Sequence, residues 1–555
     1  MQSSNTKRTG KSYPRAGAAL CAVLVLAAAG GGASAAPAET VLHSFTGGIS
    51  DGGTPRAGLI ADSKGNLYGT TVFGGGSGNG AVFKLSPSGT ETVLHSFTGG
   101  SDGLFPIGGL IADGNGNLFG TTIEGGASGA GVVFKLSPGG TETVLHAFAG
   151  GSDGANPVAG LIADSSGNLY GTALNGGASG CNGGSRCGVV FKLSPSGTET
   201  VLYSFTGGSD GANPRAGLIA DSSGNFYGTT EGSGAFKFGT VFKLSPSGTE
   251  TVLYSFKGGS DGRFPEAGLI ADSSGNLYGT TVEGGGSEGC VFGCGVVFKL
   301  SPGGTYTVLY AFTGGSDGQF PSAGLIADSN GNLYGTAERG GASGCDAFGC
   351  GVVFKLSPGG TETVLHSFTG DFTGSGGAIP RAGLIADSSG NLYGTTELGG
   401  ASSGCDSLGC GVVFKLTGTG FVPPAACGSG DAALVNKKFP PGQMTYDVSS
   451  PTRILKSIML TSSSNIGSFT LPSVVSGGHS APGGVFVKAN PAKSATFLLQ
   501  ANFVSPAFAC SIDPLTTTLK INTGHKIVQA FERIPGSEHF IEIDNGNPGL
   551  RWLRI

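Results

Sequence analysis

Arginines and acids that interrupt a repeated pattern are the residues of this 555-residue chain whose types and spacing suggest chemistry. Only 12% of the residues are charged, yet two recurrent positions carry charge in some copies of the repeat and not in others. The first position precedes Ala-Gly, and its charged members are Arg56, Arg215, Glu266 and Arg381. The second position follows Gly-Thr, and its charged members are Glu124, Glu231, Glu283, Glu338, Arg339 and Glu397.

These charged side chains would form a binding surface if the fold gathers them on one rim. Guanidinium and carboxylate groups together provide donors and acceptors for a sugar, a carboxylate or a peptide. A residue that acts on a ligand should differ between copies of a repeat, as these residues do. The simpler explanation is solvated loop charge, because charged residues are mostly exposed, and the sequence leaves both explanations open.

Other groups with catalytic or metal-binding spacing have structural explanations. One repeat position alternates between histidine and tyrosine, which favours aromatic packing over metal binding, and its histidines are His43, His95, His146 and His366. Gly-Gly-Ser-Asp-Gly matches a nucleophile-elbow pattern but occurs five times without a helix signal. Its aspartates are expected to cap their own turns, with calcium binding as the alternative. We therefore expect no catalytic residue, no resident metal and no cofactor, with calcium left open.

A seven-fold repeat supplies the elements that would position the charged residues. The segment Gly-Leu-Ile-Ala-Asp, or a close variant, begins at Gly58, Gly109, Gly160, Gly217, Gly268, Gly324 and Gly383. Each copy continues through Asn-Leu-Tyr-Gly-Thr, Val-Phe-Lys-Leu and Thr-Val-Leu-His, so four short apolar runs alternate with turn residues. Four strands in a repeat of 51 to 59 residues are typical of a propeller blade. We predict an all-β fold with a seven-bladed β-propeller over residues 40–416.

The phase of the repeat predicts how the ring closes. The fourth-strand sequence occurs at Thr40–Phe45, before the first complete copy, and is missing after Val413–Leu416. The N-terminal strand should therefore complete the last blade, which removes two exposed strand edges.

Loop lengths distinguish two faces of the predicted propeller. Short turns such as Asp62–Asn66 and Ser86–Thr90 lie on one face, the turn face. The mid-blade loops join the second and third strands of a repeat, and the inter-blade loops join one repeat to the next. Both kinds are longer and more variable, and they share the opposite, long-loop face. Binding usually resides on such loops, so the charged residues are expected there.

Cysteine usage and the N-terminus predict export. Residues 1–35 have four cations, an apolar run at Ala16–Ala29 and the small residues Ala33-Ser34-Ala35, as in a signal peptide. The ten later cysteines form an even number, as expected for disulfides in an exported chain. Four local pairs lie in mid-blade loops, where they either tether enlarged loops or preorganise a binding surface: Cys181/Cys187, Cys290/Cys294, Cys345/Cys350 and Cys405/Cys410. We expect a secreted protein, extracellular or periplasmic.

The sequence leaves the repeat after residue 416. Residues 417–430, with two consecutive prolines, read as a linker. Short apolar runs over residues 431–555 suggest a smaller β-sandwich-like domain, which Cys427 and Cys510 would staple. A formal net charge of −5 argues against nucleic-acid binding. We expect no transmembrane segment in the mature chain and a monomer.

The repeat, quoted above copy by copy, resembles the Gloeo/Verruco (GloVer) tandem repeat of exported bacterial proteins with variable C-terminal anchors. The resemblance covers about residues 40–416 and implies an extracellular or cell-surface location, but no established chemistry. The leading hypothesis is a binding or scaffold propeller that recognises an extracellular glycan or protein through its long-loop face. The alternatives are a lactonase-like or lyase-like propeller enzyme acting at the central channel mouth, and a purely structural envelope protein.

Overall fold

The structure, a computed structural model, describes residues 37–424 apart from 165, 178–186, 222, 287–288, 342–344, 346–348, 371–372, 402–404 and 406–408. Beyond residue 424 it describes only six strands. The predicted signal peptide and the cysteines Cys181, Cys427 and Cys510 lie outside the described residues. Among the described residues, no helix has the length and apolar character needed to cross a membrane.

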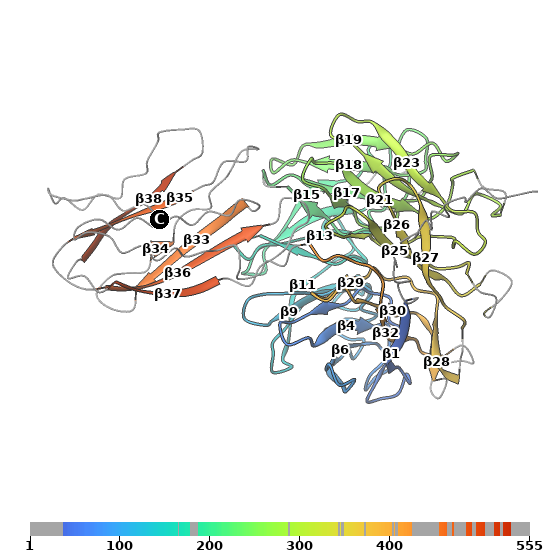
Figure 1. Cartoon of the computed structure of the whole chain (residues 1–555), viewed down its shortest axis with the longest axis horizontal. Helices are drawn as coiled ribbons and strands as arrows, with labels where there is room; N and C mark the ends of the chain where they lie inside the picture. The colour runs from blue at the N-terminus through green and yellow to red at the C-terminus, as the bar shows by residue number, and fades with distance from the viewer. Residues whose placement is uncertain are drawn as a thin grey trace, which may run out of the picture. The chain divides into compact units, whose positions relative to one another are not determined.

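Seven four-stranded antiparallel sheets form the blades of the predicted propeller (Figure 1). The first strands are β3 (Ile60–Ala61), β8 (Ile111–Ala112), β12 (Ile162–Ala163), β16 (Ile219–Ala220), β20 (Ile270–Ala271), β24 (Ile326–Ala327) and β29 (Ile385–Ala386). The second strands are β4 (Leu67–Thr71), β9 (Leu118–Thr122), β13 (Leu169–Ala173), β17 (Phe226–Thr230), β21 (Leu277–Thr281), β25 (Leu333–Ala337) and β30 (Leu392–Thr396).

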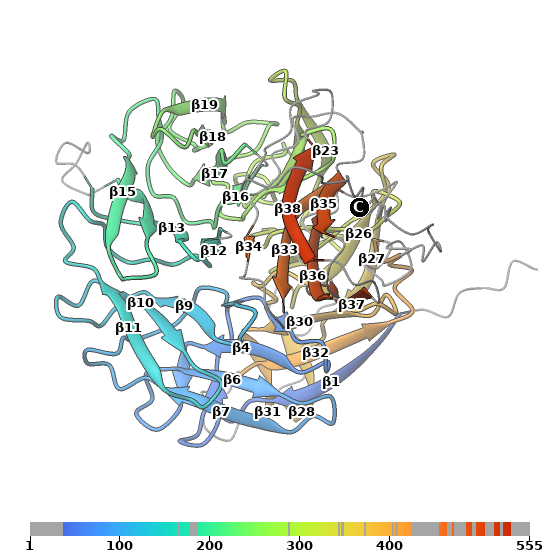
Figure 2. The same ribbon diagram turned by 90° about the vertical axis from the view of Figure 1, so that its left-hand side faces the viewer.

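The outer half of each blade consists of the third and fourth strands. The third strands are β6 (Ala81–Leu85), β10 (Val132–Leu136), β14 (Val189–Leu193), β18 (Thr240–Leu244), β22 (Val296–Leu300), β26 (Val352–Leu356) and β32 (Val412–Thr417). The fourth strands are β7 (Glu91–Ser96), β11 (Glu142–Ala147), β15 (Glu199–Ser204), β19 (Glu250–Ser255), β23 (Tyr306–Ala311), β27 (Glu362–Ser367) and β1 (Ala38–Ser44). Figure 2 shows β12 and β16 toward the centre of the ring and β15 and β19 at its periphery.

The N-terminal strand closes the ring as predicted. Strand β1 pairs antiparallel with β32, and Ala38 lies opposite Thr417. A second closure lies near the axis, where a threonine hydroxyl of each blade donates to a backbone carbonyl of the next blade at 2.9–3.4 Å. In this ring Thr395 of the last blade donates to Ala57 of the first. The ends of the repeat are therefore joined at both the outer and the inner edge.

Glycines that precede the first strands let the blades approach one another at the axis. A Cβ atom on Gly160 would lie 3.1 Å from the carbonyl oxygen of Gly109, and one on Gly383 would lie 3.3 Å from that of Gly324. Larger residues would push neighbouring blades apart. Close backbone approach thus explains the glycine at these two positions.

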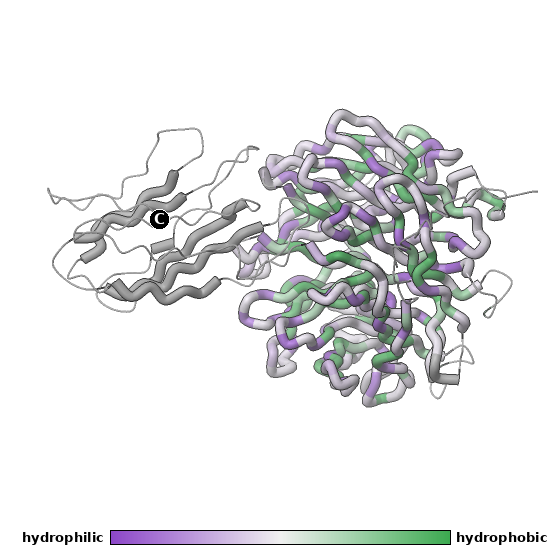
Figure 3. The backbone as a smooth tube through the Cα atoms, in the orientation of Figure 1, coloured by the Kyte–Doolittle hydropathy of each residue, from purple (hydrophilic) through white to green (hydrophobic). Residues whose placement is uncertain are grey.

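The core lies between the blades. The central phenylalanine of each third strand, such as Phe83, is fully buried. It packs edge-to-face on the phenylalanine that follows the fourth strand of the preceding blade, such as Phe45, with ring centroids 5.1–5.4 Å apart around the ring. In Figure 3 hydrophobic stretches of the blades alternate with less hydrophobic connections. Burial of these rings gives the rigid frame on which the loops stand.

Two small sheets lie in the long loops. Strand β2 (Gly52–Gly53) pairs with β5 (Phe73–Gly74), and β28 (Thr373–Ala378) pairs with β31 (Leu398–Ala401). Each joins an inter-blade loop to a mid-blade loop.

The expected linker begins within the last blade. Strand β32 includes Thr417, and Phe421 is buried against Tyr334 with ring centroids 4.9 Å apart. Burial of this ring ties the first residues after the repeat to the propeller.

Six strands are described beyond residue 424: β33 (Ile454–Ser462), β34 (Phe469–Thr470), β35 (Gly484–Asn490), β36 (Ala495–Val504), β37 (Leu515–Ile521) and β38 (Lys526–Arg533). They pair as β34-β33-β36-β37 and β35-β38. The β-rich character expected of this region is present in these strands, and the sandwich remains a prediction.

Candidate functional site

Seven inter-blade loops share one unusual residue, which lies immediately before a proline. These residues have φ between 54° and 60° although none is glycine, and they are Thr54, Phe105, Asn156, Asn213, Phe264, Phe320 and Ile379. Left-handed conformations are unfavourable for side chains in general and worst for β-branched residues such as Thr54 and Ile379. Something in each loop must hold them in place.

Two backbone hydrogen bonds hold each left-handed residue. Its N–H donates to a carbonyl in the mid-blade loop of the preceding blade, as Ile379 does to Cys350 at 2.8 Å. Its carbonyl accepts from the residue that follows the second strand of its own blade, as Ile379 does from Glu397 at 3.0 Å. Each left-handed residue thereby joins two blades and fixes the residues on either side of it.

Charged side chains from these fixed positions form two connected groups. Arg56 donates to Glu397 through Nε at 3.0 Å and Nη2 at 2.5 Å. Arg381 contacts the same carboxylate and lies 3.4 Å from Glu338. Each arginine lies two residues before an axial glycine, so this group lies beside the ring axis on the long-loop face.

The second group is built on Arg215. Its Nε donates to Glu231 at 3.0 Å and lies 3.8 Å from Glu266. Glu266 also interacts electrostatically with Glu338 and Arg381, which links the two groups. We call the whole set the axial charged cluster, and its members are Arg56, Arg215, Glu231, Glu266, Glu338, Arg381 and Glu397.

Burial within the axial charged cluster separates cations from anions. The three arginine side chains are 40–41% exposed, whereas the four glutamate side chains are less exposed: Glu397 9%, Glu338 12%, Glu266 26% and Glu231 30%. The guanidinium groups therefore face solvent over carboxylates that hold them. Such prepositioned arginines lose little freedom when a ligand binds.

Glu266 has a raised pKa within the axial charged cluster. Burial raises its pKa, the carboxylates of Glu231 and Glu338 add to this rise, and Arg215 and Arg381 oppose it. The resulting pKa of Glu266 is about 7. When Glu266 carries a proton, the remaining three carboxylates balance the three guanidinium groups.

The corresponding positions in the other blades are apolar or uncharged. Before the first strand these residues are Ile107, Val158 and Ser322, and after the second strand they are Val72, Ile123, Leu174 and Val282. The long-loop end of the axis thus has a charged side, over blades four to seven and the start of blade one, and an apolar side, over blades one to three.

Three predicted residues lie away from the axial charged cluster. Glu124, Glu283 and Arg339 come one residue later than Glu231, Glu338 and Glu397 relative to Gly-Thr, and their backbones bridge to the inter-blade loops. Successive side chains in extended chain point to opposite sides. Glu283 instead contacts Arg263, whose guanidinium lies 4.4 Å from the ring centre of Phe292.

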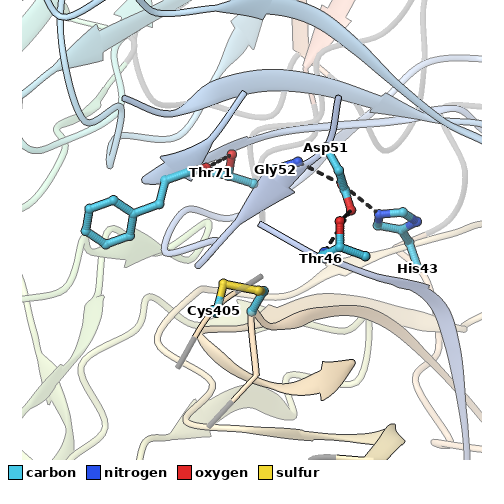
Figure 4. Close-up of a disulfide and its surroundings, with 8 residues drawn as sticks. His43, Thr46, Asp51, Gly52, Thr71 and Cys405 are labelled. Carbon is cyan, nitrogen blue, oxygen red and sulfur yellow. Dashed lines mark hydrogen bonds and ion pairs between the residues drawn. A yellow bond between two sulfur atoms is a disulfide. The ribbon is translucent and has the colours of Figure 1, made fainter. Parts of the chain in front are cut away.

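The described cysteines pair as predicted. Disulfides join Cys290 to Cys294, Cys345 to Cys350, and Cys405 to Cys410, and Cys187 is also disulfide-bonded. Figure 4 shows the disulfide at Cys405 beside the inter-blade loop that carries Asp51 and Gly52. Cross-links at this position bear on the inter-blade loops as well as on their own loop.

A set of half-buried acids between the outer strands was missed by the sequence reasoning. Glu91, which begins a fourth strand, lies near Asp51 and His43 of the preceding blade, and burial with the Asp51 charge raises its pKa to about 7. Glu142, Glu199, Glu250 and Glu362 repeat this arrangement. The sequence signal that could have revealed these acids is the recurrence of Glu before Thr-Val-Leu. We call the places where these glutamates approach the aspartate beside the preceding blade the outer seams.

Histidine and tyrosine interchange at the outer seams because either side chain can reach the aspartate of the inter-blade loop that follows it. His43 Nε2 lies 3.1 Å from Asp51, and the Tyr254 hydroxyl donates to Asp261 at 2.7 Å. Asp51 also accepts from the backbone N–H of Thr46, which caps the turn as expected. Among the described residues, no group of three or more His, Cys, Asp or Glu is arranged to hold a metal ion.

Comparisons with known proteins found a matching family model and several similar solved structures. The model of the Gloeobacter/Verrucomicrobia repeat matches residues 33–184 and 181–406. The comparison with curated proteins found no match. A fungal alcohol oxidase of the AA5 family, solved with copper, covers 87% of this chain and 98% of its own at 12% identity, with a TM-score of 0.42. A protein described as a 6-phosphogluconolactonase from Bacteroides uniformis covers 56% and 83% at 18% identity, with a TM-score of 0.37.

Proposed function

The chain belongs to the Gloeobacter/Verrucomicrobia repeat family, and from this premise we propose that it is an exported binding protein whose propeller recognises an extracellular glycan at the axial charged cluster. The observation that carries the proposal is the convergence of Arg56, Arg215 and Arg381 on less exposed carboxylates at one end of the ring axis. Disulfides in the loops around this site support an oxidising compartment.

Charge balance favours a glycan of uncharged sugar units. Guanidinium groups donate and carboxylates accept, so paired groups can bind neighbouring hydroxyls without a net charge on the ligand. The cluster holds three guanidinium groups and four carboxyl groups, so its net charge is small and gives neither a polyanion nor a polycation a strong attraction. The apolar residues Ile123, Val158 and Leu174 on the other side of the axis suit the C–H face of a sugar ring.

Calorimetric titration of the mature protein tests the proposal. The probes are soluble neutral glycans (laminarin, xylan and galactomannan) and two acidic ones (polygalacturonate and alginate). We expect binding of at least one neutral glycan, and a loss of about tenfold or more in affinity for each arginine changed to alanine. Lys64→Ala removes a cation on the turn face and should leave affinity unchanged. Equal affinity of the Arg56, Arg215 and Arg381 variants and the parent protein would reject the axial site.

Glu266 favours a second candidate function, hydrolysis or elimination within a bound glycan. The Glu266 carboxyl has a pKa of about 7, so near neutral pH it is present in both its acid and its base form, and other carboxyl groups lie beside it. A reducing-sugar assay and an absorbance assay for unsaturated products, run with the same five glycans, test this function. Turnover that disappears in Glu266→Gln while binding remains would establish it, and absence of turnover leaves the binding function alone.

A further inference from the structure

The disulfides contact the backbone framework of the axial charged cluster. The N–H groups of Phe320, Ile379 and Thr54 donate to the carbonyl oxygens of Cys294, Cys350 and Cys410 at 2.9, 2.8 and 2.6 Å. Each acceptor is the second cysteine of a disulfide in the preceding blade. Asn213 makes the same bond to Cys187, at 2.8 Å. A cross-linked residue therefore supplies the acceptor for four left-handed residues.

These cysteines are firmly embedded. Cys294, Cys350 and Cys410 are fully buried and belong to the apolar clusters between blades. The sulfur atoms also pack on the inter-blade loops, because a Cβ atom on Gly314 or Gly370 would collide with them. The disulfide thus touches the inter-blade loop through its sulfurs and binds it through its carbonyl.

The cross-links precede all three arginines of the axial charged cluster. The residue that ends each cysteine-anchored segment has a hydrogen-bonding side chain, and these residues are Arg215, Ser322, Arg381 and Arg56. In the other three blades the acceptors are Asn79, Ala130 and Phe238, and the segments end in Ile107, Val158 and Glu266. An ion pair depends on position more sharply than an apolar contact does, and a cross-link precedes every arginine of the axial charged cluster. Glu266 is the cluster member that is placed without one.

We propose that the mid-blade disulfides are positioning devices for the axial charged cluster, which hold the left-handed residues between them and the site. When the disulfide is intact, the carbonyl of Cys350 keeps Ile379 left-handed. Ile379 in turn binds the N–H of Glu397 and fixes the direction of Arg381. Without the cross-link the carbonyl moves, Ile379 relaxes toward a favourable conformation, and Glu397 and Arg381 separate. The consequence for ligand affinity rests on the proposed function, whereas the positioning does not.

Residue-resolved hydrogen–deuterium exchange on Cys345→Ser/Cys350→Ser tests this positioning. The amides of Ile379 and Glu397 should exchange about tenfold faster or more than in the parent protein. The amides of Asn156 and Leu174, which make the same two bonds in a blade without a cross-link at that point, should not change. Unchanged exchange at Ile379 and Glu397 in a folded variant would overturn the proposal.

A second variant guards against general loosening. Cys290→Ser/Cys294→Ser should speed exchange at Phe320 and Glu338 and leave Ile379 and Glu397 as they were. Uniform acceleration in both variants, including Asn156, would also overturn the proposal, because it would show that the disulfides stabilise the ring as a whole. Parent protein reduced with dithiothreitol under native conditions provides the comparison if a variant does not fold. None of these measurements needs a ligand, so failure of glycan binding leaves this test intact.

Discussion

The two faces of this propeller share one set of strands and differ in how strictly they repeat. On the turn face, an aspartate in each blade accepts from two backbone N–H groups, an asparagine side chain and, in six blades, a tyrosine hydroxyl, as Asp272 does from Ser274, Asn276 and Tyr278 at 2.7–2.9 Å. On the long-loop face, equivalent positions carry Arg, Glu, Ser, Ile or Val. The residues that repeat in every blade therefore hold the turns, whereas the residues that vary between blades form the candidate site.

The pKa values of Asp272 on the turn face and Glu266 in the axial charged cluster shift in opposite directions. Burial would raise the pKa of Asp272, but hydrogen bonds from Asn276 and Tyr278 outweigh it, and the pKa is lowered. In the axial charged cluster, burial and neighbouring carboxylates raise the pKa of Glu266 to about 7. Hydrogen bonds stabilise the charged form of Asp272, whereas burial, with the charges of Glu231 and Glu338 added to it, destabilises the charged form of Glu266.

The largest expected effect is on the turn face. Asp272→Ala removes the acceptor for four hydrogen bonds and should lower the free energy of unfolding by about 2–4 kcal/mol, because partly buried donors lose their partner. Urea denaturation measures the change, and Ser274→Ala, in the same turn, should cost less than about 0.5 kcal/mol. The structural role of this face is refuted if both variants are equally stable.

The next effect is on the pH dependence of stability, which should have opposite signs for Glu266 and Asp272. The folded pKa of Glu266 lies above its ordinary value of 4.5, so its contribution to stability is fully present below pH 4.5 and is lost as pH rises through 7. Glu266→Gln cannot ionise and should exceed the parent in stability by about 1–2 kcal/mol at pH 8.5, with little difference at pH 4.5. Urea denaturation at several pH values measures this.

Asp272→Asn is the matched turn-face variant for that experiment. The folded pKa of Asp272 is lowered, so its contribution is present above pH 3.8 and is lost as pH falls. Its variant should therefore be weaker than the parent at pH 8.5, with the gap narrowing in acid. If the free energies of unfolding of the two variants change with pH in the same direction relative to the parent, the contrast between Glu266 and Asp272 is wrong.

A smaller effect tests whether the scaffold is as uniform as the turn face. The Thr280 hydroxyl donates to Ala323 at 3.2 Å, and the Thr172 hydroxyl donates to Ala216 at 2.9 Å. Thr280→Val and Thr172→Val should each cost about 1 kcal/mol, since a buried carbonyl loses its donor. Thr→Ser at either site keeps the hydroxyl and serves as control. If the losses in free energy of unfolding differ by more than twofold between the two variants, the axial threonine bonds are not equivalent in the different blades.

The smallest expected effect lies within the long-loop face. Glu124 is exposed, so Glu124→Ala should change the free energy of unfolding by less than about 0.5 kcal/mol. Glu338→Ala removes a buried partner of Arg381 and should cost more, about 1 kcal/mol. Thermal denaturation at constant pH compares them. A cost for Glu124→Ala above that for Glu338→Ala would place Glu124 in a network of its own.

Repetition made most of the scaffold predictable. Seven copies of one pattern indicated the number of blades, and the displaced Thr40–Phe45 segment indicated closure, because a strand that lacks a partner must find one. The local cysteine pairs were predictable from spacing within single loops. The left-handed Thr54 and Ile379 were not, because neither residue type favours that conformation and only contacts with neighbouring blades impose it.

The sequence by itself determined the repeat, the strands, the turns and the set of charged residues that break the symmetry. Only the tertiary structure decided which of them meet. Glu338 and Glu283 lie in different blades, at repeat positions that differ by one residue. Because side chains alternate along an extended chain, Glu338 points toward Arg381 and Glu283 toward Arg263. Arg56 and Glu397 pair across 341 residues because ring closure sets the first blade beside the last, and no local pattern encodes that distance.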